Sequence, residues 1–174
     1  MIKIEAARRL RAVKPGFKLR TRRVSAGRET GEGAGALFYA EDTGRFLLLK
    51  RSMQGDEGGT WCSLGGGRDR LPSGEFESVP TTVRREAFEE GGFPMDAPCD
   101  LKFIDTFAHD DGFRFHNFIG VVPSEFVPEL NDEHTAYRWV KWNDFPDNMH
   151  PKMMEALNSK LGRLVLRRNC DVPF

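Results

Sequence analysis

The feature that most constrains this chain is a run of glycines at residues 65–67, followed by a segment with the pattern of a helix. Ser78 is a favourable N-cap, Pro80 is tolerated in a first helical turn, and Gly91-Gly92 is typical of a helix end. About three and a half turns fit between Ser78 and Glu90. The sequence therefore predicts a glycine loop that leads directly into a helix.

Three carboxylates are expected to share one face of this helix. Glu86, Glu89 and Glu90 fall within an arc of about 100°. Like charges placed this close repel one another, and a hard divalent cation such as Mg²⁺ or Mn²⁺ would offset the repulsion. The alternative is an ordinary solvated acidic face. Five fixed residues in the pattern Arg-Glu-x-x-Glu-Glu-x-Gly make a chance match rare, which favours the metal site.

Residues 85–93, with the sequence REAFEEGGF, resemble the second half of the Nudix box. That pattern reads Arg-Glu-U-x-Glu-Glu-x-Gly-U, where U is apolar, and every position matches. Glu77 precedes the arginine by eight residues, which is the spacing of the family. The family has a glycine six residues before that glutamate, where this chain has Leu71. Gly67 stands ten residues before Glu77, so we interpret residues 68–77 as a loop four residues longer than the family pattern.

The resemblance implies an α/β fold, namely an α/β/α sandwich around a mixed β-sheet. Strands on either side of a central helix, with a closing helix at the C-terminus, agree with this class. The resemblance also implies hydrolysis of a diphosphate linkage with Mg²⁺, or alternatively Mn²⁺. A glycine carbonyl is expected to join the metal ligands, and we assign it to Gly66 with Gly65 and Gly67 as alternatives. The predicted ligands are thus Glu86, Glu89, Glu90 and Gly66.

One carboxylate should accept a proton from the attacking water, and Glu86 and Glu133 are the two candidates. Glu133 lies just before an apolar strand pattern, where the family commonly has a glutamate. The alternatives at this position are a plain loop acid, or His134 as a weaker competitor for the same task. Arg85, counted with the catalytic residues, is expected to brace a neighbouring carboxylate, and Glu77 is expected to tie the loop to the helix start.

Four residues are candidates for contact with the substrate. Arg68 and Arg70 could bind its phosphates, with plain solvent exposure as the alternative. Trp61 could form a wall of the substrate site or belong to the core. Asn117 could contact a base or ribose. The expected substrate is a nucleoside triphosphate or another nucleoside diphosphate derivative. Two other functions stay open, an inactive nucleotide-binding or regulatory module and an RNA-directed protein.

Charge is distributed unevenly along the 174 residues, although the net charge is zero. Residues 1–28 hold ten Lys and Arg against Glu5 alone. We therefore divide the chain into a basic N-terminal segment, residues 1–30, and a Nudix-like domain, residues 31–174. The basic segment could attract nucleic acid or substrate phosphates. We favour a segment packed on the acidic domain or a mobile arm, because no aromatic residue interleaves the charges to stack on bases.

Composition bounds the remaining possibilities. With 39% apolar and 30% charged residues the chain resembles an ordinary soluble protein. Three scattered cysteines argue against a disulfide framework and favour the cytoplasm. There is no apolar run of about 20 residues, so we expect no membrane association. A homodimer is left open.

The other segments predict the surroundings of the site. Residues 31–35 are expected to form a flexible link. Two hairpins are expected, at residues 36–51 and 100–122. The segment that begins at residue 151 and reaches residue 165 is expected to form one amphipathic helix.

Overall fold

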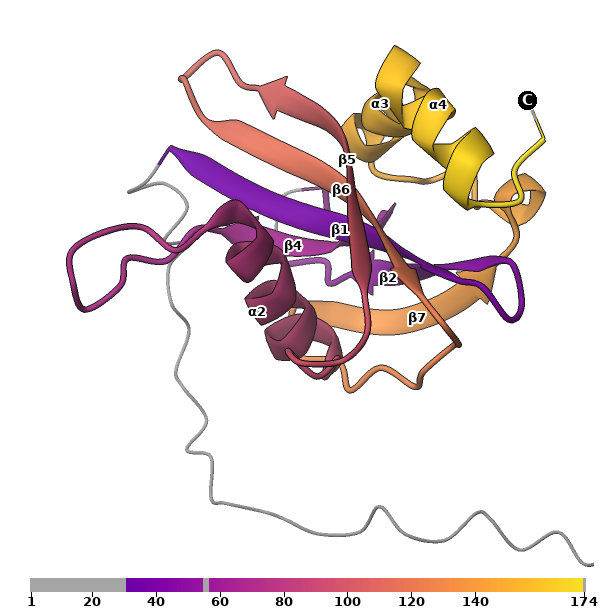
Figure 1. Ribbon diagram of the computed structural model, residues 1–174, viewed down its shortest axis with the longest axis horizontal. Coiled ribbons are helices and arrows are strands. Elements are labelled where there is room, and N and C mark those ends of the chain that lie inside the picture. The colour runs from indigo at the N-terminus through magenta and orange to yellow at the C-terminus, as the bar shows by residue number, and fades with distance from the viewer. Residues whose placement is uncertain (1–30, 55–56, 174) are drawn as a thin grey trace, which may run out of the picture.

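The computed structural model describes residues 31–54 and 57–173, so the predicted basic segment lies outside the described residues. One seven-stranded mixed sheet has the order β3-β2-β1-β6-β5, with β4 paired to β1 and β7 paired to β2 (Figure 1). The strands are β1 (Glu32–Ala40), β2 (Arg45–Arg51), β3 (Trp61–Cys62), β4 (Leu64–Gly67), β5 (Asp100–Ala108), β6 (Arg114–Val122) and β7 (His134–Val140). The helices are α2 (Val79–Gly91), α3 (Pro151–Asn158) and α4 (Lys160–Asn169), with a 3₁₀ turn η1 (Trp142–Asp144).

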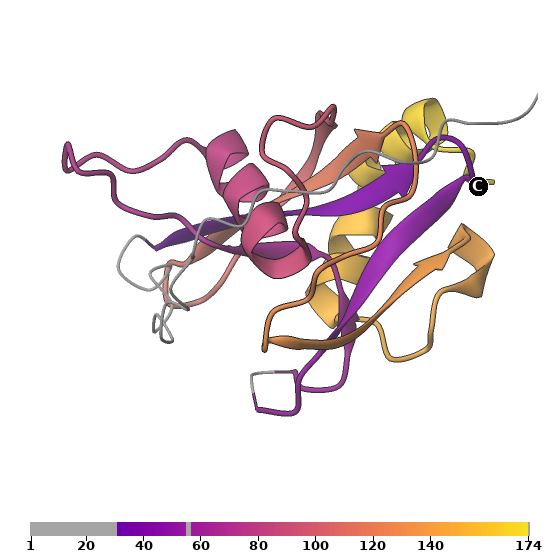
Figure 2. The same cartoon turned by 90° about the horizontal axis from the view of Figure 1, so that it is seen from below.

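The sheet is covered on both faces, which confirms the predicted α/β/α sandwich. Alternate residues of β1 enter two separate apolar cores. Ala36 and Phe38 pack with α2, whereas Leu37 and Tyr39 pack with α3 and α4. Figure 1 shows α2 at the lower left and the α3–α4 pair at the upper right, and Figure 2 gives the view from below. β1 and the middle of β2 are buried on both faces, as their apolar runs predict.

The predicted flexible link at residues 31–35 is wrong, because β1 begins at Glu32. Gly33 and Gly35 lie in the middle of the sheet, where β1 pairs antiparallel with β4 and parallel with β6. A Cβ on Gly33 would stand 2.7 Å from the Gly66 carbonyl oxygen, and one on Gly35 would stand 2.5 Å from that of Leu64. These glycines therefore serve close packing of backbone on backbone and not flexibility.

Both predicted hairpins are confirmed. β1 and β2 pair antiparallel around a turn that contains Gly44 at a φ of 65°. β5 and β6 form the second, longer hairpin, and its register shifts between Phe103 and Asp105.

The single C-terminal helix predicted from residue 151 onward is wrong, because Ser159 divides it into α3 and α4. Ser159 leaves the helical region at ψ 160°, and its hydroxyl accepts a hydrogen bond from the Gly162 N–H at 2.9 Å. The same hydroxyl donates to the Ile104 carbonyl at 3.2 Å. The division lets Leu157 and Leu166 both reach the same core, where each is fully buried.

The predicted carboxylate helix is confirmed as α2. The Ser78 hydroxyl accepts a hydrogen bond from the Thr81 N–H, and Gly92 ends the helix at a φ of 66°. No helix of residues 31–54 and 57–173 has both the length and the apolar character needed to span a membrane.

Candidate metal and catalytic site

The carboxylates of α2 lie against the glycine strand β4. A Cβ on Gly66 would stand 2.6 Å from Glu86 Oε1, so only a glycine leaves room for this carboxylate. The Gly65 N–H donates to Glu90 Oε2 at 2.7 Å. The predicted ligands Glu86, Glu90 and Gly66 are therefore brought together by the packing of α2 on β4.

Arg85 binds the surrounding groups with all three guanidinium nitrogens, and its Nε donates to Glu77 Oε1 at 3.1 Å. Its Nη2 donates to Glu77 Oε1 at 2.7 Å and to the Gly67 carbonyl at 2.6 Å. Its Nη1 lies 2.7 Å from Glu86 Oε1 and 2.9 Å from Glu89 Oε2. One guanidinium thus holds the loop, the start of the helix and two of the three helix carboxylates.

Glu77 is buried at 3% exposure, although it precedes the helix. Its Oε1 also accepts a hydrogen bond from the Asp69 N–H at 2.9 Å. Burial acts to raise the pKa of Glu77, but the Arg85 hydrogen bonds and the Asp69 N–H outweigh it and hold the pKa below its usual value. A charged Glu77 therefore fixes both ends of the loop from Arg68 to Glu77.

Burial changes the proton affinity of two helix carboxylates. It raises the pKa of Glu86 to about 7, against the opposing charge of Arg85. Glu90 is buried more deeply at 5% exposure, and burial followed by the Glu86 charge raises its pKa well above the usual value. Two acids that resist ionisation beside each other are the expected consequence of crowding in a dry site.

The charge of Glu133 is felt at this cluster. After burial and the nearer charges, its carboxylate contributes to the raised pKa of both Glu86 and Glu90. Its backbone is fixed by the Ser52 N–H, which donates to the Glu133 carbonyl at 2.8 Å. Burial, followed by the charge of Arg51, lowers the pKa of neighbouring His134 to about 4, so this imidazole is a weak base.

The donors of this cluster suit a hard cation, but they are engaged with protein groups. In the part of the chain that the structure describes, no three His, Cys, Asp or Glu side chains already surround one point. Glu86 and Glu89 both pair with Arg85 Nη1, and Glu90 accepts from the Gly65 N–H. A cation that binds here must exchange with these partners. The carboxylate and carbonyl oxygens are otherwise the ligands that Mg²⁺ prefers.

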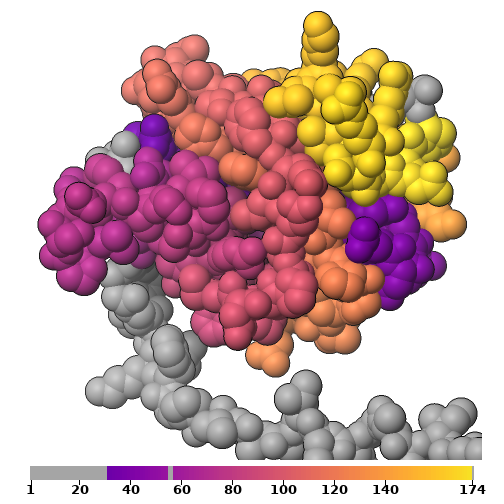
Figure 3. Space-filling model, in the orientation of Figure 1, coloured from indigo at the N-terminus to yellow at the C-terminus, as the bar shows by residue number. Residues whose placement is uncertain are grey.

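Arg68 and Arg70 make their contacts within the lengthened loop, which projects from the domain at the left of Figures 1 and 3. Arg68 donates to the Glu77 carbonyl at 2.6 Å and pairs with the Glu32 carboxylate. Arg70 donates to the Gly74 carbonyl at 2.6 Å and lies over the Phe76 ring at 4.3 Å. Phosphate contact by either residue stays a prediction and would require these bonds to open.

The structure places Trp61 and Asn117 on the opposite face of the sheet from α2. Trp61 is 5% exposed in the core beneath α3, with the Arg138 guanidinium over its ring at 4.8 Å. Asn117 is 8% exposed and pairs in register with Gly35 of β1 and Asp105 of β5. Little surface of either side chain is left for a substrate in this arrangement.

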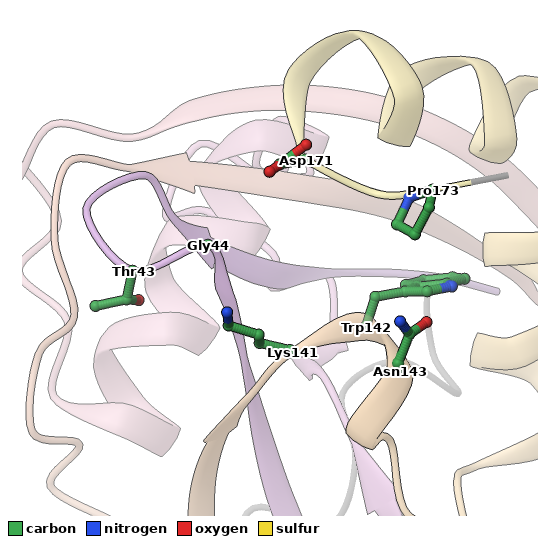
Figure 4. A pocket seen from close by; sticks show the side chains of 7 residues that line it. All are labelled: Thr43, Gly44, Lys141, Trp142, Asn143, Asp171 and Pro173. Carbon is green, nitrogen blue, oxygen red and sulfur yellow. The ribbon is translucent and has the colours of Figure 1, made fainter.

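A shallow pocket of about 130 Å³ lies at the far end of β1 from the carboxylates (Figure 4). The turn between β1 and β2, the segment after β7 and the C-terminal segment surround it. Its lining residues are Thr43, Gly44, Lys141, Trp142, Asn143, Asp171 and Pro173. None of the predicted site residues contributes to this pocket.

Two contacts at the site were not predicted from the sequence. Asp69 approaches Arg85 Nε at 3.8 Å through its carboxylate. Cys62 Sγ lies 3.7 Å from His134 Nε2 beneath the end of α2. Cys62 and His134 are separated by 72 positions in the sequence, so no local sequence pattern predicts this contact.

Comparison with known proteins agrees with the family resemblance of residues 85–93. The family model of the NUDIX domain matches residues 29–160. No curated protein sequence gives a significant match. Among solved structures, a MutT NUDIX hydrolase from Burkholderia pseudomallei is 26% identical, with a TM-score of 0.58, over 74% of this chain and 96% of that one.

Two further structures share the fold at lower identity. The Nudix hydrolase RenU from M. smegmatis is 21% identical, with a TM-score of 0.60, over 82% of this chain and 88% of that one. An Ap4A hydrolase from C. elegans is 20% identical, with a TM-score of 0.53, over 78% of this chain and 94% of that one.

Proposed function

Because the chain belongs to the Nudix family, we propose that it hydrolyses a diphosphate linkage in a nucleoside triphosphate or another nucleoside diphosphate derivative, with Mg²⁺ as cofactor. A diphosphate repels nucleophiles through its own negative charge. Its hydrolysis therefore needs a cation that offsets this charge, a positioned water molecule and a group that accepts a proton.

The observation that carries the proposal is the packing of the α2 carboxylates against the glycines of β4. Glu86, Glu89, Glu90 and the Gly66 carbonyl are the residues that would hold Mg²⁺ or Mn²⁺. When bound, the cation offsets the charge of the diphosphate and of the departing phosphate. A solvated acidic face would not bury Glu90 to 5% exposure or place Glu86 against a glycine backbone.

The remaining roles follow from position and charge. Glu86 or Glu133 accepts a proton from the attacking water, since Glu86 belongs to the cluster and the exposed Glu133 acts on it through its charge. Arg85 positions Glu77 and the Gly67 carbonyl, which keeps the loop and α2 in fixed relation. When a cation binds, Arg85 is expected to keep these two contacts and release Glu86 and Glu89.

Asn117, Gly35 and Gly65 form one row over three adjacent strands. This row lies on the face of the sheet opposite the α2 carboxylates, and Asn117 is 8% exposed. Contact between Asn117 and the nucleoside part of a substrate held at those carboxylates would therefore require a change in this arrangement. Base or ribose contact by Asn117, a cytoplasmic location and a homodimer remain predictions.

Turnover of a nucleotide panel with Mg²⁺ tests the proposal. We expect phosphate or pyrophosphate release by the native chain, and a loss of at least about a hundredfold in Glu90→Gln, because one cation ligand is removed. Glu155→Gln is the matched control, since Glu155 is an exposed carboxylate of α3 that pairs with Lys152. Equal rates for the native chain and Glu90→Gln would reject the enzyme and favour a binding module.

A further inference from the structure

The half of the sheet beyond α2 carries apolar side chains that no helix of residues 31–54 and 57–173 fully covers. α2 packs mainly on β4 and β1, whereas α3 and α4 pack on β5 from the other face of the sheet. Phe118 of β6 belongs to the core on the α2 side, and Phe103 of β5 meets its ring edge-to-face at 5.6 Å. Phe103 is nevertheless 42% exposed. The α2 face of β5 and β6 is therefore apolar and accessible.

The neighbouring side of α2 extends this apolar surface. Arg84 Nη2 donates to the Cys99 carbonyl at 3.0 Å, so this side of the helix faces the segment that leads into β5. Phe88 lies one turn further along the same side and is 47% exposed. Met95, whose carbonyl also accepts from Arg84, is 45% exposed. Figure 3 shows α2 and β5 side by side on this face of the molecule.

Strand register brings the two parts of the surface to the same level. Leu64, Ala36, Phe118 and Phe103 are neighbours in one row over β4, β1, β6 and β5. Gly91 packs on Leu64, since a Cβ on Gly91 would stand 2.9 Å from Leu64 Cδ2. The last turns of α2 thus lie level with Phe118 and Phe103. We call the group formed by Phe88, Met95, Phe103 and Phe118 the α2–β5 patch.

Charge distinguishes this patch from a second group of exposed apolar side chains, Leu161 and Leu164 of α4, which are 41% and 42% exposed. Residues 160–169 contain four Lys and Arg and no acid. Residues 86–100 contain five Asp and Glu and no Lys or Arg, and three of the five are exposed, namely Glu89, Asp96 and Asp100. A basic partner would therefore be attracted to the α2–β5 patch and repelled by α4.

The chain itself supplies a segment that is both basic and apolar. Four apolar residues near its start recur at the spacing of one helix face, namely Ile2, Ala6, Leu10 and Val13. Residues 2–13 also contain four Lys and Arg against one acid. The pattern of this segment is complementary to the α2–β5 patch in both apolar character and charge.

The position at which the chain enters the domain allows this segment to reach the patch. The Arg114 N–H donates to the Gly31 carbonyl at 2.8 Å, which fixes the entry beside the start of β6. Phe118 lies four residues further along β6, at a distance of about 13 Å. Residues 14–30 can span up to about 55 Å when extended, so they can bridge this distance with length to spare.

We propose that residues 2–13 dock on the α2–β5 patch of their own chain, with their apolar stripe against Phe88, Phe103 and Phe118 and their cations toward the exposed carboxylates of residues 86–100. The segment thereby extends the layer formed by α2 over β5 and β6. This docking does not require hydrolysis, so it is tested independently of the proposed function.

Disulfide trapping in the full chain tests the contact. Leu10→Cys is combined with Phe103→Cys, or with Leu164→Cys as the matched control, because Phe103 and Leu164 are equally exposed. Both variants also carry Cys99→Ser, since Cys99 precedes β5 and is only partly buried. We expect oxidised glutathione to link positions 10 and 103 at least tenfold faster than positions 10 and 164.

Peptide mass spectrometry identifies each link, and mobility in a non-reducing gel separates links within one chain from links between two chains. Equal rates for the two pairs would overturn the proposal. Links that form only between chains would overturn it as well, because the patch would then bind a second copy.

Limited proteolysis gives a second measurement without introduced cysteines. Trypsin cleaves after Lys and Arg, so docking should slow cleavage within residues 2–13. Phe103→Ser should raise the rate of this cleavage at least fivefold, whereas Leu164→Ser should leave it unchanged. Circular dichroism checks that both variants are folded. Cleavage that is equally fast in the native chain and in folded Phe103→Ser would contradict docking on this patch.

Discussion

The two faces of the sheet bury similar apolar side chains but very different amounts of polarity. The core under α3 and α4 consists of apolar residues such as Leu37, Leu157 and Leu166. The α2 side also has an apolar core, but most of the buried polar groups of the described chain lie there. These are Glu77, Thr82, Glu90 and His134, each at least nine-tenths buried.

The two faces of the sheet therefore contribute differently to stability and to the proposed chemistry. A buried carboxylate lowers the stability of the native state unless a partner or a cation compensates it. Among the described residues, no buried carboxylate lies on the α3–α4 face. The apolar packing of that face can therefore offset the destabilising effect of the buried carboxylates on the α2 face. The arrangement predicts that substitutions on the two faces affect different measurable properties.

The largest effect is expected for Arg85→Ala, which removes the compensating charge of the α2 face. Glu77 would remain buried without its partner, and the free energy of unfolding should fall by about 3–5 kcal/mol. Urea unfolding without divalent cations measures this loss. Adding Glu77→Gln to Arg85→Ala should restore part of the stability, because the unpaired charge is then gone. A loss of less than about 0.5 kcal/mol would contradict the role of Arg85.

The opposite face is tested by Leu157→Ala. Leu157 is fully buried in the apolar core, so the free energy of unfolding should fall by about 2–5 kcal/mol. The rate of hydrolysis per folded molecule should stay the same, because the substitution lies far from the carboxylates. Leu161→Ala is the matched control, since Leu161 is 41% exposed and should cost less than about 0.5 kcal/mol. A changed Mg²⁺ affinity in Leu157→Ala would contradict the prediction that substitutions on this face affect stability alone.

Adding a single methyl group on the α2 face should lower both the stability and the Mg²⁺ affinity of the protein. In Gly66→Ala the new Cβ would meet the Glu86 carboxylate at 2.6 Å, and overpacking of this kind costs about 1–3 kcal/mol. Mg²⁺ affinity should fall as well, because Glu86 must move. Thermal unfolding and calorimetric titration with Mg²⁺ measure the two effects. Unchanged Mg²⁺ affinity would mean that Glu86 does not need its place beside Gly66.

The smallest effect is a pH dependence that belongs to the α2 face alone. Burial raises the pKa of Glu86 to about 7 without a cation, so the folded state binds this proton more tightly than the unfolded state. The stabilising contribution of the proton is present at low pH and is lost as the pH rises through about 7. Between about pH 6 and about pH 8 the metal-free protein should lose about 1 kcal/mol.

Mg²⁺ should cancel this loss, because it favours the ionised carboxylate. Unfolding at the two pH values with and without Mg²⁺ measures both effects. Glu86→Gln should reduce the pH dependence but not abolish it, because burial also raises the pKa of Glu90. A metal-free protein that is more stable at the higher pH would contradict the assignment.

Much of the fold could be predicted because its signals are local. The cap at Ser78, the glycines after Glu90 and the apolar runs of β1 and β2 act on neighbouring residues, so their patterns were sufficient. The predicted link at residues 31–35 is wrong because a glycine in a strand and a glycine in a linker look alike in sequence. Only the approach of β4 to Gly33 and Gly35 distinguishes the two.

The candidate site, like the fold, could be predicted only in part from the sequence. The carboxylates of α2 share a face through helical spacing alone, so their proximity could be predicted. The positions of Asn117 and Trp61 on the other side of the sheet depend on strand register, which a single sequence does not fix. The contact between Cys62 and His134 depends on three strands that meet far apart in the chain.

The parallel pairing of β1 with β6 also governs how the chain acquires its structure. Glu32 finds its partner Arg114 only 82 positions later, and residues between them must be synthesised first. At about 5–20 residues per second the ribosome needs several seconds to reach β6. During that interval one edge of the apolar strand β1 has no partner. Nascent chains of this topology are therefore expected to depend on chaperones, and folding should be slow relative to domains with mostly local contacts.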